Sequence, residues 1–301
     1  MDKDLVEDIL MYYPGEIVNV NDHRMHVYSE GHGDVTLVFM SGNQTCAPYF
    51  DFKPLFSKLS GEYRIAIAER AGFGFSEIAG VPRDIDTILF ETRTALQMAN
   101  IEPPYVLFPH SIAGIEALYW VQCFPHEVKA IIGLDAAFPS YYETMGDFLK
   151  GQAVWQKRIA PKISDKFKIL IPFVSNFLPP IKYKILNNED ARLCKALFFH
   201  RILTSNMISE WETVEENSKK INRELLKDVP MLLYVTPGKE MGLIKGYWEK
   251  LVREYTEGLN AETVFVKASH YVHDMIPDRI SNESKIFINK ILAGSVAAAD
   301  T

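Results

Sequence analysis

Short apolar runs alternate along the chain with segments of helical periodicity, and this alternation constrains the fold more than any other feature of the sequence. Apolar runs typical of buried strands occur at 35–40, 63–68, 105–108, 128–134, 230–235 and 262–266. Two earlier runs, 16–20 and 24–28, alternate apolar and polar residues as edge strands do. Apolar residues at helical spacing occur at 85–100, 112–124 and 277–292. Repeated units of this kind predict a mostly parallel sheet with helices on both faces, whose chemistry lies at the carboxyl ends of the strands.

The alternation stops near residue 139 and resumes near residue 229. The roughly 90 residues between these points have helical but no strand periodicity, for instance at 142–154 and 193–203, which is too long a stretch for a plain loop. We therefore predict one sheet domain made of residues 1–138 and 229–301, with residues 139–228 inserted as a helical cap.

Composition excludes several classes of protein. The chain has 32 Lys and Arg against 39 Asp and Glu, a formal charge of −7, and no dense basic run, which argues against a nucleic-acid-binding protein. Cys46, Cys123 and Cys194 are too few and too scattered for a disulfide framework or a cysteine-based zinc site. The histidines lack the spacing of known metal motifs, so we expect no metal and no cofactor. Without an apolar signal segment or a run long enough to span a membrane, we expect a cytoplasmic protein.

The strongest chemical signal is the segment YVLFPHSIAG at 105–114. It is typical of a strand, a sharp turn with Ser111 at its apex, and a helix. A nucleophile on such a turn needs compact residues two positions before and after it; Ala113 fits, and Pro109 stands where glycine is usual. The helix would direct its free N–H groups and positive dipole end at the serine, which favours a nearby oxyanion. A serine in this place can also be an ordinary helix N-cap.

Four motifs in the same order resemble those of the α/β-hydrolase superfamily, and the resemblance covers nearly the whole chain. They are SGN at 41–43, ERAGFGFS at 69–76, PHSIAG at 109–114 and ASHYVH at 268–273. The family has His-Gly-x, Asp-Arg-x-Gly-x-Gly-x-Ser, Gly-His-Ser-x-Gly-Gly and Gly-His-x-x-His in these places. The resemblance implies an α/β-hydrolase fold with a mostly parallel eight-stranded sheet, helices on both faces and an inserted α-helical cap.

The resemblance also implies a serine nucleophile with a histidine base. Ser111 would be the nucleophile and His270 the base, with His273 as the competing histidine. In this fold the oxyanion is bound by the backbone N–H groups of the residue after the nucleophile and of the turn after the third strand, which here are Ile112 and Asn43. Ser41 replaces the usual histidine of that turn, which leaves the shape of the turn open.

Two carboxylates compete to be the acid that orients His270. The superfamily usually places the acid after the seventh strand, where Glu240 stands one residue earlier than the usual position. Asp135 follows the sixth strand in GLDAAFP at 133–139, which resembles the corresponding segment of pancreatic-type lipases. An Asp at this strand end can also be purely structural. The sequence keeps both candidates, with Asp135 preferred.

We expect the inserted segment to lie over the carboxyl edge of the sheet as a lid. Its most apolar part, 167–180, is either an acyl-binding wall that contacts lipid weakly or a buried lid segment whose lysines reach solvent. Pro172 and the short length exclude a membrane span. The lysines in and around this segment, which would face anionic lipid in the first case, are Lys162, Lys166, Lys168, Lys182 and Lys184.

A nucleophilic serine at the turn argues against the dehalogenase and epoxide-hydrolase branches of the superfamily, which use an aspartate there. We expect a carboxylesterase-like or lipase-like serine hydrolase that acts on a small, apolar ester. An aminopeptidase or a carbon–carbon-bond hydrolase would keep the serine too, and the former would need lid carboxylates to hold the substrate amine. Ser41 and Pro109 also suit a non-hydrolytic sensor derived from the fold. The lid carboxylates are Glu143, Asp147, Glu189 and Glu210.

Overall fold

The computed structural model describes residues 13–166, 176, 178–239 and 246–299, apart from the side chains of residues 160–166 and 295–299. The described strands form one eight-stranded sheet in the order β1-β2-β4-β3-β5-β6-β7-β8. The first two pairs in this order are antiparallel and the other five are parallel, which confirms the predicted sheet. The strands are β1 (Glu16–Val20), β2 (His23–Glu30), β3 (Thr36–Met40), β4 (Arg64–Ala68), β5 (Tyr105–Pro109), β6 (Val128–Leu134), β7 (Met231–Val235) and β8 (Ala261–Phe265).

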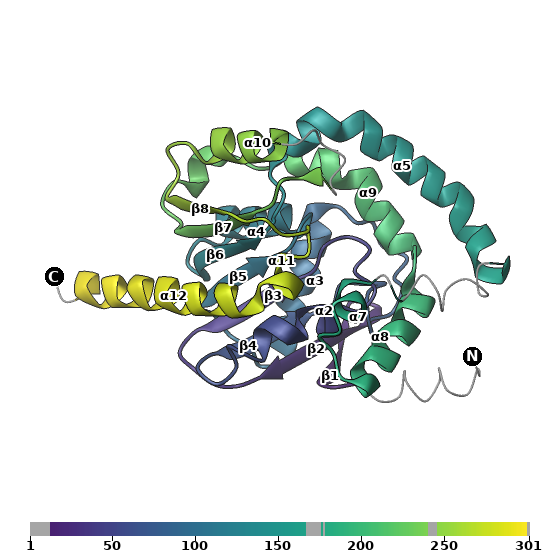
Figure 1. Ribbon diagram of the computed structural model, residues 1–301, viewed down its shortest axis with the longest axis horizontal. Helices are drawn as coiled ribbons and strands as arrows, with labels where there is room; N and C mark the ends of the chain where they lie inside the picture. Colours follow the sequence, from purple (N-terminus) through teal and green to yellow (C-terminus); the bar gives the residue numbers. More distant parts are fainter. Residues whose placement is uncertain (1–12, 167–175, 177, 240–245, 300–301) are drawn as a thin grey trace.

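Helices cover both faces of the sheet, as Figure 1 shows. In β5 the alternate residues face opposite sides: Leu107 packs with side chains of the helices on one face, and Phe108 with those on the other. Because both faces are buried, the strand is apolar throughout rather than alternating. One face is covered by α3 (Ile85–Met98), α4 (Ala113–Cys123) and α10 (Tyr247–Thr256), and the other by α2 (Pro48–Phe56) and α12 (Pro277–Ala299).

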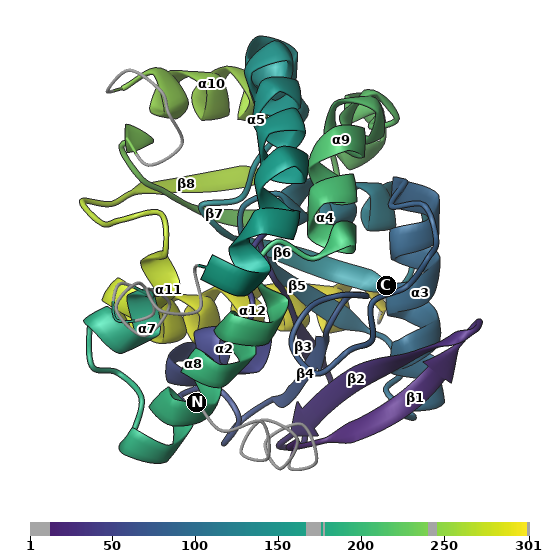
Figure 2. The same cartoon turned by 90° about the vertical axis from the view of Figure 1, so that its right-hand side faces the viewer.

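The chain between β6 and β7 contains helices and, among its described residues, no strand. Two of these helices, α5 and α9, lie side by side in both views (Figures 1 and 2). The predicted helix at 142–154 lies within α5, and most of the one at 193–203 within α8. The elements are α5 (Pro139–Lys166), α7 (Pro179–Lys182), α8 (Asn188–Arg201), α9 (Ser205–Lys219) and the 3-10 helix η3 (Arg223–Leu226).

The predicted lipid-facing or acyl-binding stretch at 167–180 lies largely outside the described residues, and so do Lys168 and the side chains of Lys162 and Lys166. Lys182 and Lys184 are exposed. None of the described helices combines the length and apolar character needed to cross a membrane.

Buried hydrogen bonds attach α9 to the loops at the carboxyl edge of the sheet. The side-chain amide of Asn206 pairs with both backbone groups of Ala79, at 3.0 and 2.9 Å. The amide of Asn217 accepts from Ile85 N at 2.9 Å and donates to Arg83 O at 3.1 Å. Thr204 caps the helix by accepting from Met207 N. Since each of these amides is buried and paired, α9 has a defined position relative to the sheet.

Candidate active site

Ser111 occupies a strained turn between β5 and α4. Its φ is +55°, a left-handed conformation that costs a non-glycine residue free energy and clusters at functional sites. The turn is held from β6, because Ala137 N donates to Ser111 O at 2.8 Å. A Cβ atom at Gly114 would lie 2.2 Å from Ala137 O, so only glycine allows α4 to approach the end of β6 this closely. The predicted strand, turn and helix around Ser111 are therefore present.

His270 and Asp135, predicted from separate motifs, are hydrogen-bonded to each other. His270 Nδ1 lies 2.7 Å from Asp135 Oδ2, and the carboxylate is fully buried. Asp135 follows β6 and also accepts from Thr236 N at 2.9 Å, Thr236 Oγ1 at 2.7 Å and Trp248 Nε1 at 2.9 Å. Four donors thus fix one carboxylate, an arrangement suited to orienting an imidazole and stabilising its charged form. The other candidate, Glu240, lies outside the described residues.

Ser111 and His270 line the same cavity, which has a volume of about 350 Å³. The rest of its lining comes from the turn after β3, from α5, from Trp211 of α9, and from His110 and Tyr271, which adjoin the two predicted catalytic residues in sequence. The turn after β3 contributes Asn43 and Gln44, and α5 contributes Tyr141, Tyr142, Phe148, Leu149 and Gln152. This inner cavity gives a substrate access to both predicted catalytic side chains, and most of its remaining wall is aromatic or amide-bearing.

The two predicted oxyanion donors lie on either side of Ser111. Ile112 is the next residue, at the start of α4. Asn43 is in the turn after β3, where a Cβ at Gly42 would lie 3.0 Å from Ser111 Cβ, so the two turns are in close contact. Among the described residues, neither backbone N–H has a hydrogen-bond acceptor. Both are therefore free to donate to a substrate oxygen.

Arg70 determines the shape of the turn that the sequence left open at Ser41. Its Nη1 donates to Ser41 O at 2.8 Å, and its Nε and Nη2 donate to Glu210 of α9. Asn43 Nδ2 in turn donates to Met207 O at 2.8 Å and to Glu210 Oε2 at 3.2 Å. Backbone and side-chain contacts of this kind hold the turn without a histidine at position 41.

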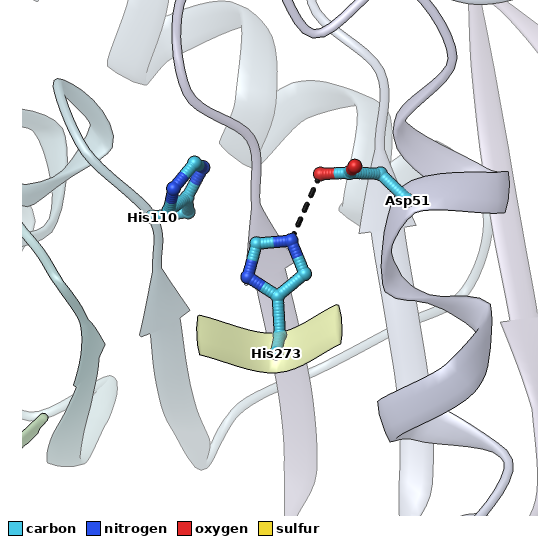
Figure 3. Close-up of side chains that lie close together, drawn as sticks. All are labelled: Asp51, His110 and His273. Atoms are coloured by element: carbon cyan, nitrogen blue, oxygen red, sulfur yellow. Dashed lines mark hydrogen bonds and ion pairs between the residues drawn. The ribbon is translucent and has the colours of Figure 1, made fainter. Parts of the chain in front are cut away.

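His273, the competing base, is fully buried in a cluster with Asp51 and His110 (Figure 3) and does not line the cavity. Its Nε2 lies 3.0 Å from Asp51 Oδ2. His110 Nε2 donates to the backbone oxygen of His270 at 3.1 Å, and burial, together with the neighbouring His270 and His273 rings, holds the pKa of His110 well below its usual value. A neutral His110 thus supports the loop that carries His270. The sequence did not predict this contact, since it depends on residues 160 positions apart.

One group of side chains in the described part of the chain has the composition of a metal site, namely Asp51, His110 and His273, whose ligand atoms lie within 4.8 Å of one another. One ring nitrogen of each histidine already has a hydrogen-bond partner: His273 Nε2 pairs with Asp51 Oδ2, and His110 Nε2 pairs with the backbone oxygen of His270.

The four carboxylates that the sequence assigned to a lid are not gathered at the serine. Glu210 is neutralised by Arg70 in a buried pair. Asp147 lines a second cavity next to the first. Glu143 and Glu189 are exposed and line neither cavity.

Comparison with known proteins identifies relatives over nearly the full length. The chain is 34% identical over 294 residues to YbdG of Bacillus subtilis, an uncharacterized protein, covering 95% of this chain and 89% of the relative. It is similar in structure to an epoxide hydrolase of Bacillus megaterium (TM-score 0.68, 16% identity, 91% of this chain and 100% of that one). It is also similar to an esterase of Thermogutta terrifontis (TM-score 0.61, 13% identity, 92% and 99%). No model of a known protein family matches the chain.

Proposed function

We propose that the chain, which has the α/β-hydrolase fold, is a serine hydrolase that cleaves carboxylic esters through Ser111, His270 and Asp135. The observation that carries the proposal is the 2.7 Å contact between His270 Nδ1 and Asp135 Oδ2, on a histidine that shares a cavity with the strained Ser111. A serine needs an adjacent base, and the base needs an orienting acid. The epoxide hydrolase named above is similar in fold only, and a serine at the turn favours ester chemistry.

The proposed reaction has two steps. Ser111 Oγ attacks the ester carbonyl carbon while His270 takes the serine proton, and the Asp135 carboxylate stabilises the resulting imidazolium. The backbone N–H groups of Asn43 and Ile112 bind the oxyanion. The carbon–oxygen bond of the ester then breaks, and His270 gives its proton to the departing alcohol. Water, deprotonated by His270, then attacks the acyl carbon; the bond between this carbon and Ser111 Oγ breaks, Ser111 Oγ takes the proton from His270, and the carboxylic acid is released.

Residues 139–228 serve in this proposal as a cap over a core formed by residues 1–138 and 229–301. Support comes from the aromatic and aliphatic side chains that α5 and α9 contribute to the cavity, among them Tyr141, Leu149 and Trp211. Such walls exclude water and bind the apolar part of a small ester. An aminopeptidase is less well supported, because the pairing of Glu210 with Arg70 leaves it unavailable to a substrate amine.

A fluorophosphonate probe tests the proposal directly, because it reacts with activated serines. We expect the purified protein to be labelled and to hydrolyse 4-nitrophenyl acetate, and we expect Ser111→Ala and His270→Gln to lose both properties. Ser57→Ala, at the exposed end of α2, is the matched control and should retain both. A folded wild type that is neither labelled nor active would contradict the proposal and support a sensor. Faster cleavage of aminoacyl 4-nitroanilides than of esters would support a peptidase instead.

A further inference from the structure

The inner cavity lies beside a second, outer cavity of about 590 Å³. The two share Gln44, Phe148, Gln152 and Trp211, so they adjoin each other, and we refer to them together as the cleft. The outer cavity is also lined, from α5, by Asp147, Gly151, Trp155 and Gln156. A short-chain ester of a simple alcohol would leave most of this space unfilled, so the cleft suits a substrate with a larger second part.

Several polar side chains that line this cleft have no hydrogen-bond partner in the described part of the protein. Among the described residues, the side chains of Gln44, Gln152 and Asp147 form no hydrogen bond or ion pair with one another or with their neighbours. Gln156 is only 5% exposed, yet its Oε1 has no described partner, and the same holds for the buried Nε1 of Trp211. Since buried polar groups are nearly always paired, the acceptor Gln156 Oε1 and the donor Trp211 Nε1 point to a ligand that supplies both a donor and an acceptor.

Aromatic surface lies beside these polar groups. Phe148 and Trp155 are 52% and 61% exposed, and they are seven residues apart on α5, which places them on the same side of the helix. Trp211 faces the cleft from α9. Exposed aromatic rings next to amide groups bind molecules that have both apolar faces and polar edges.

The charge of the cleft excludes an anionic group. Among its described lining residues no Lys or Arg occurs, and Asp147 is the one carboxylate. The lysines of α5 that lie nearest in sequence, Lys150 and Lys157, form ion pairs with Glu215 and Glu212 of α9. A phosphate or carboxylate would meet no cation here, whereas a neutral group that accepts from and donates to amides meets several partners.

We propose that the outer cavity binds a neutral polyhydroxylated group, a sugar or polyol, and that this group is the alcohol part of the ester. The inference rests on the proposed ester hydrolysis. A hydroxyl both donates and accepts, as the side-chain amides of Gln44, Gln152 and Gln156 do. The C–H face of a sugar ring packs on the negative face of an indole such as that of Trp155. When the ester bond breaks, the polyol leaves with the proton from His270, and the acyl group stays on Ser111.

Three acetates of primary alcohols test the inference at a constant acyl group: 6-O-acetyl-D-glucose, n-hexyl acetate and acetylcholine. We expect kcat/KM for the sugar acetate to exceed that for the other two by at least about tenfold, because only the hydroxylated alcohol pairs with the amides. A preference for n-hexyl acetate or acetylcholine would overturn the inference while leaving ester hydrolysis intact. If the wild type does not hydrolyse 4-nitrophenyl acetate at all, the proposed ester hydrolysis itself is contradicted.

Variants of the cleft provide a second readout. Trp155→Ala and Gln152→Leu should raise KM for the sugar acetate by about tenfold, with a smaller change in kcat and a smaller effect on n-hexyl acetate. Val154→Ala, whose side chain is exposed on the same helix but lines neither cavity, is the matched control and should change neither value. Equal losses on both substrates in the cleft variants would contradict the inference.

Asp147→Asn separates hydroxyl recognition from cation recognition, because the amide still accepts hydrogen bonds but carries no charge. We expect a change in KM for the sugar acetate of no more than about threefold. If the wild type prefers acetylcholine and Asp147→Asn selectively loses acetylcholine hydrolysis, the cleft binds a cation. That outcome would overturn the inference.

Discussion

Arg70 Nε and Nη2 donate to the two carboxylate oxygens of Glu210, at 2.8 and 3.0 Å, and both side chains are buried. Arg70 follows β4, whereas Glu210 lies on α9, so the pair joins the sheet to the helices between β6 and β7. Both residues also contact the turn at 41–43, where Arg70 donates to Ser41 O and Glu210 accepts from Asn43. One ion pair therefore positions both α9 and the turn beside Ser111.

Removing one partner of this pair should be strongly destabilising, since it leaves an uncompensated buried charge. We expect Arg70→Met to lower the free energy of unfolding by about 3–5 kcal/mol, measured by urea denaturation. The double variant Arg70→Met/Glu210→Met should recover much of this loss. The exposed pair of Arg24 and Glu77 provides the control: Arg24→Met should cost no more than about 1 kcal/mol. A double variant that is less stable than Arg70→Met would contradict this account.

The acid that orients His270 can be identified by amide substitutions at both candidate positions. Asp135→Asn should reduce kcat on 4-nitrophenyl acetate by about 10²–10⁴-fold, because the amide cannot stabilise the imidazolium. Glu240→Gln should change kcat by less than about threefold. Circular dichroism should verify that Asp135→Asn remains folded, since Thr236 and Trp248 donate to this carboxylate. The opposite ranking of the two losses would assign the role to Glu240.

The close approach of Gly42 to the turn at Ser111 predicts an effect on catalysis rather than on folding. A Cβ there would lie 2.9 Å from His110 Nδ1 and 3.0 Å from Ser111 Cβ. Gly42→Ala should therefore displace the turn that carries Asn43 and lower kcat by roughly 10- to 100-fold, as measured by steady-state kinetics. Gly61→Ala, whose Cβ would have no atom within 4 Å, should leave kcat unchanged. Normal activity of Gly42→Ala would show that the turn is not an oxyanion donor.

Glu116 predicts a pH-dependent contribution to stability. Burial raises the pKa of its carboxyl to about 7, despite the opposing charge of Arg70 and the hydrogen bond from Thr92. Since this folded-state pKa exceeds the ordinary value, the carboxyl favours folding below about pH 4.5, and this contribution is lost as the pH rises toward 7.

Glu116→Gln removes this titration while keeping an acceptor for Thr92. As the pH rises from 4.5 to 8, we expect the free energy of unfolding of the variant to increase relative to that of the wild type by on the order of 1–3 kcal/mol. Urea denaturation at each pH measures this difference. Glu262→Gln, at an exposed position of β8, should show a difference of less than about 0.5 kcal/mol over the same range. A Glu116→Gln difference that is independent of pH would contradict the raised pKa.

Local patterns predicted most of the sheet, the turn that carries Ser111 and the place of His270 before the last helix. The run at 128–134 coincides with β6, and the other core strands begin or end within a residue or two of their predicted positions. The helix expected to end near 292 continues to Ala299. The sequence did not predict α2, whose Pro48 and Pro54 obscure its periodicity. It also did not define α9, which has a mostly polar sequence and buries side chains such as Asn206 and Glu210 through pairing rather than through apolar packing.

The amino-acid sequence by itself determined the order of strands and helices, the sharp turn at Ser111 and the place of His270 before the last helix, because periodicity, turn residues and motifs are local. Only the tertiary structure decided that Asp135 contacts His270, 135 residues away, and that Arg70 pairs with Glu210, 140 residues away. These contacts depend on which strand ends adjoin and on how α9 packs over them. A carboxylate at a strand end carries no local signal of its partner, since its hydrogen bonds form only once the sheet has brought distant loops together.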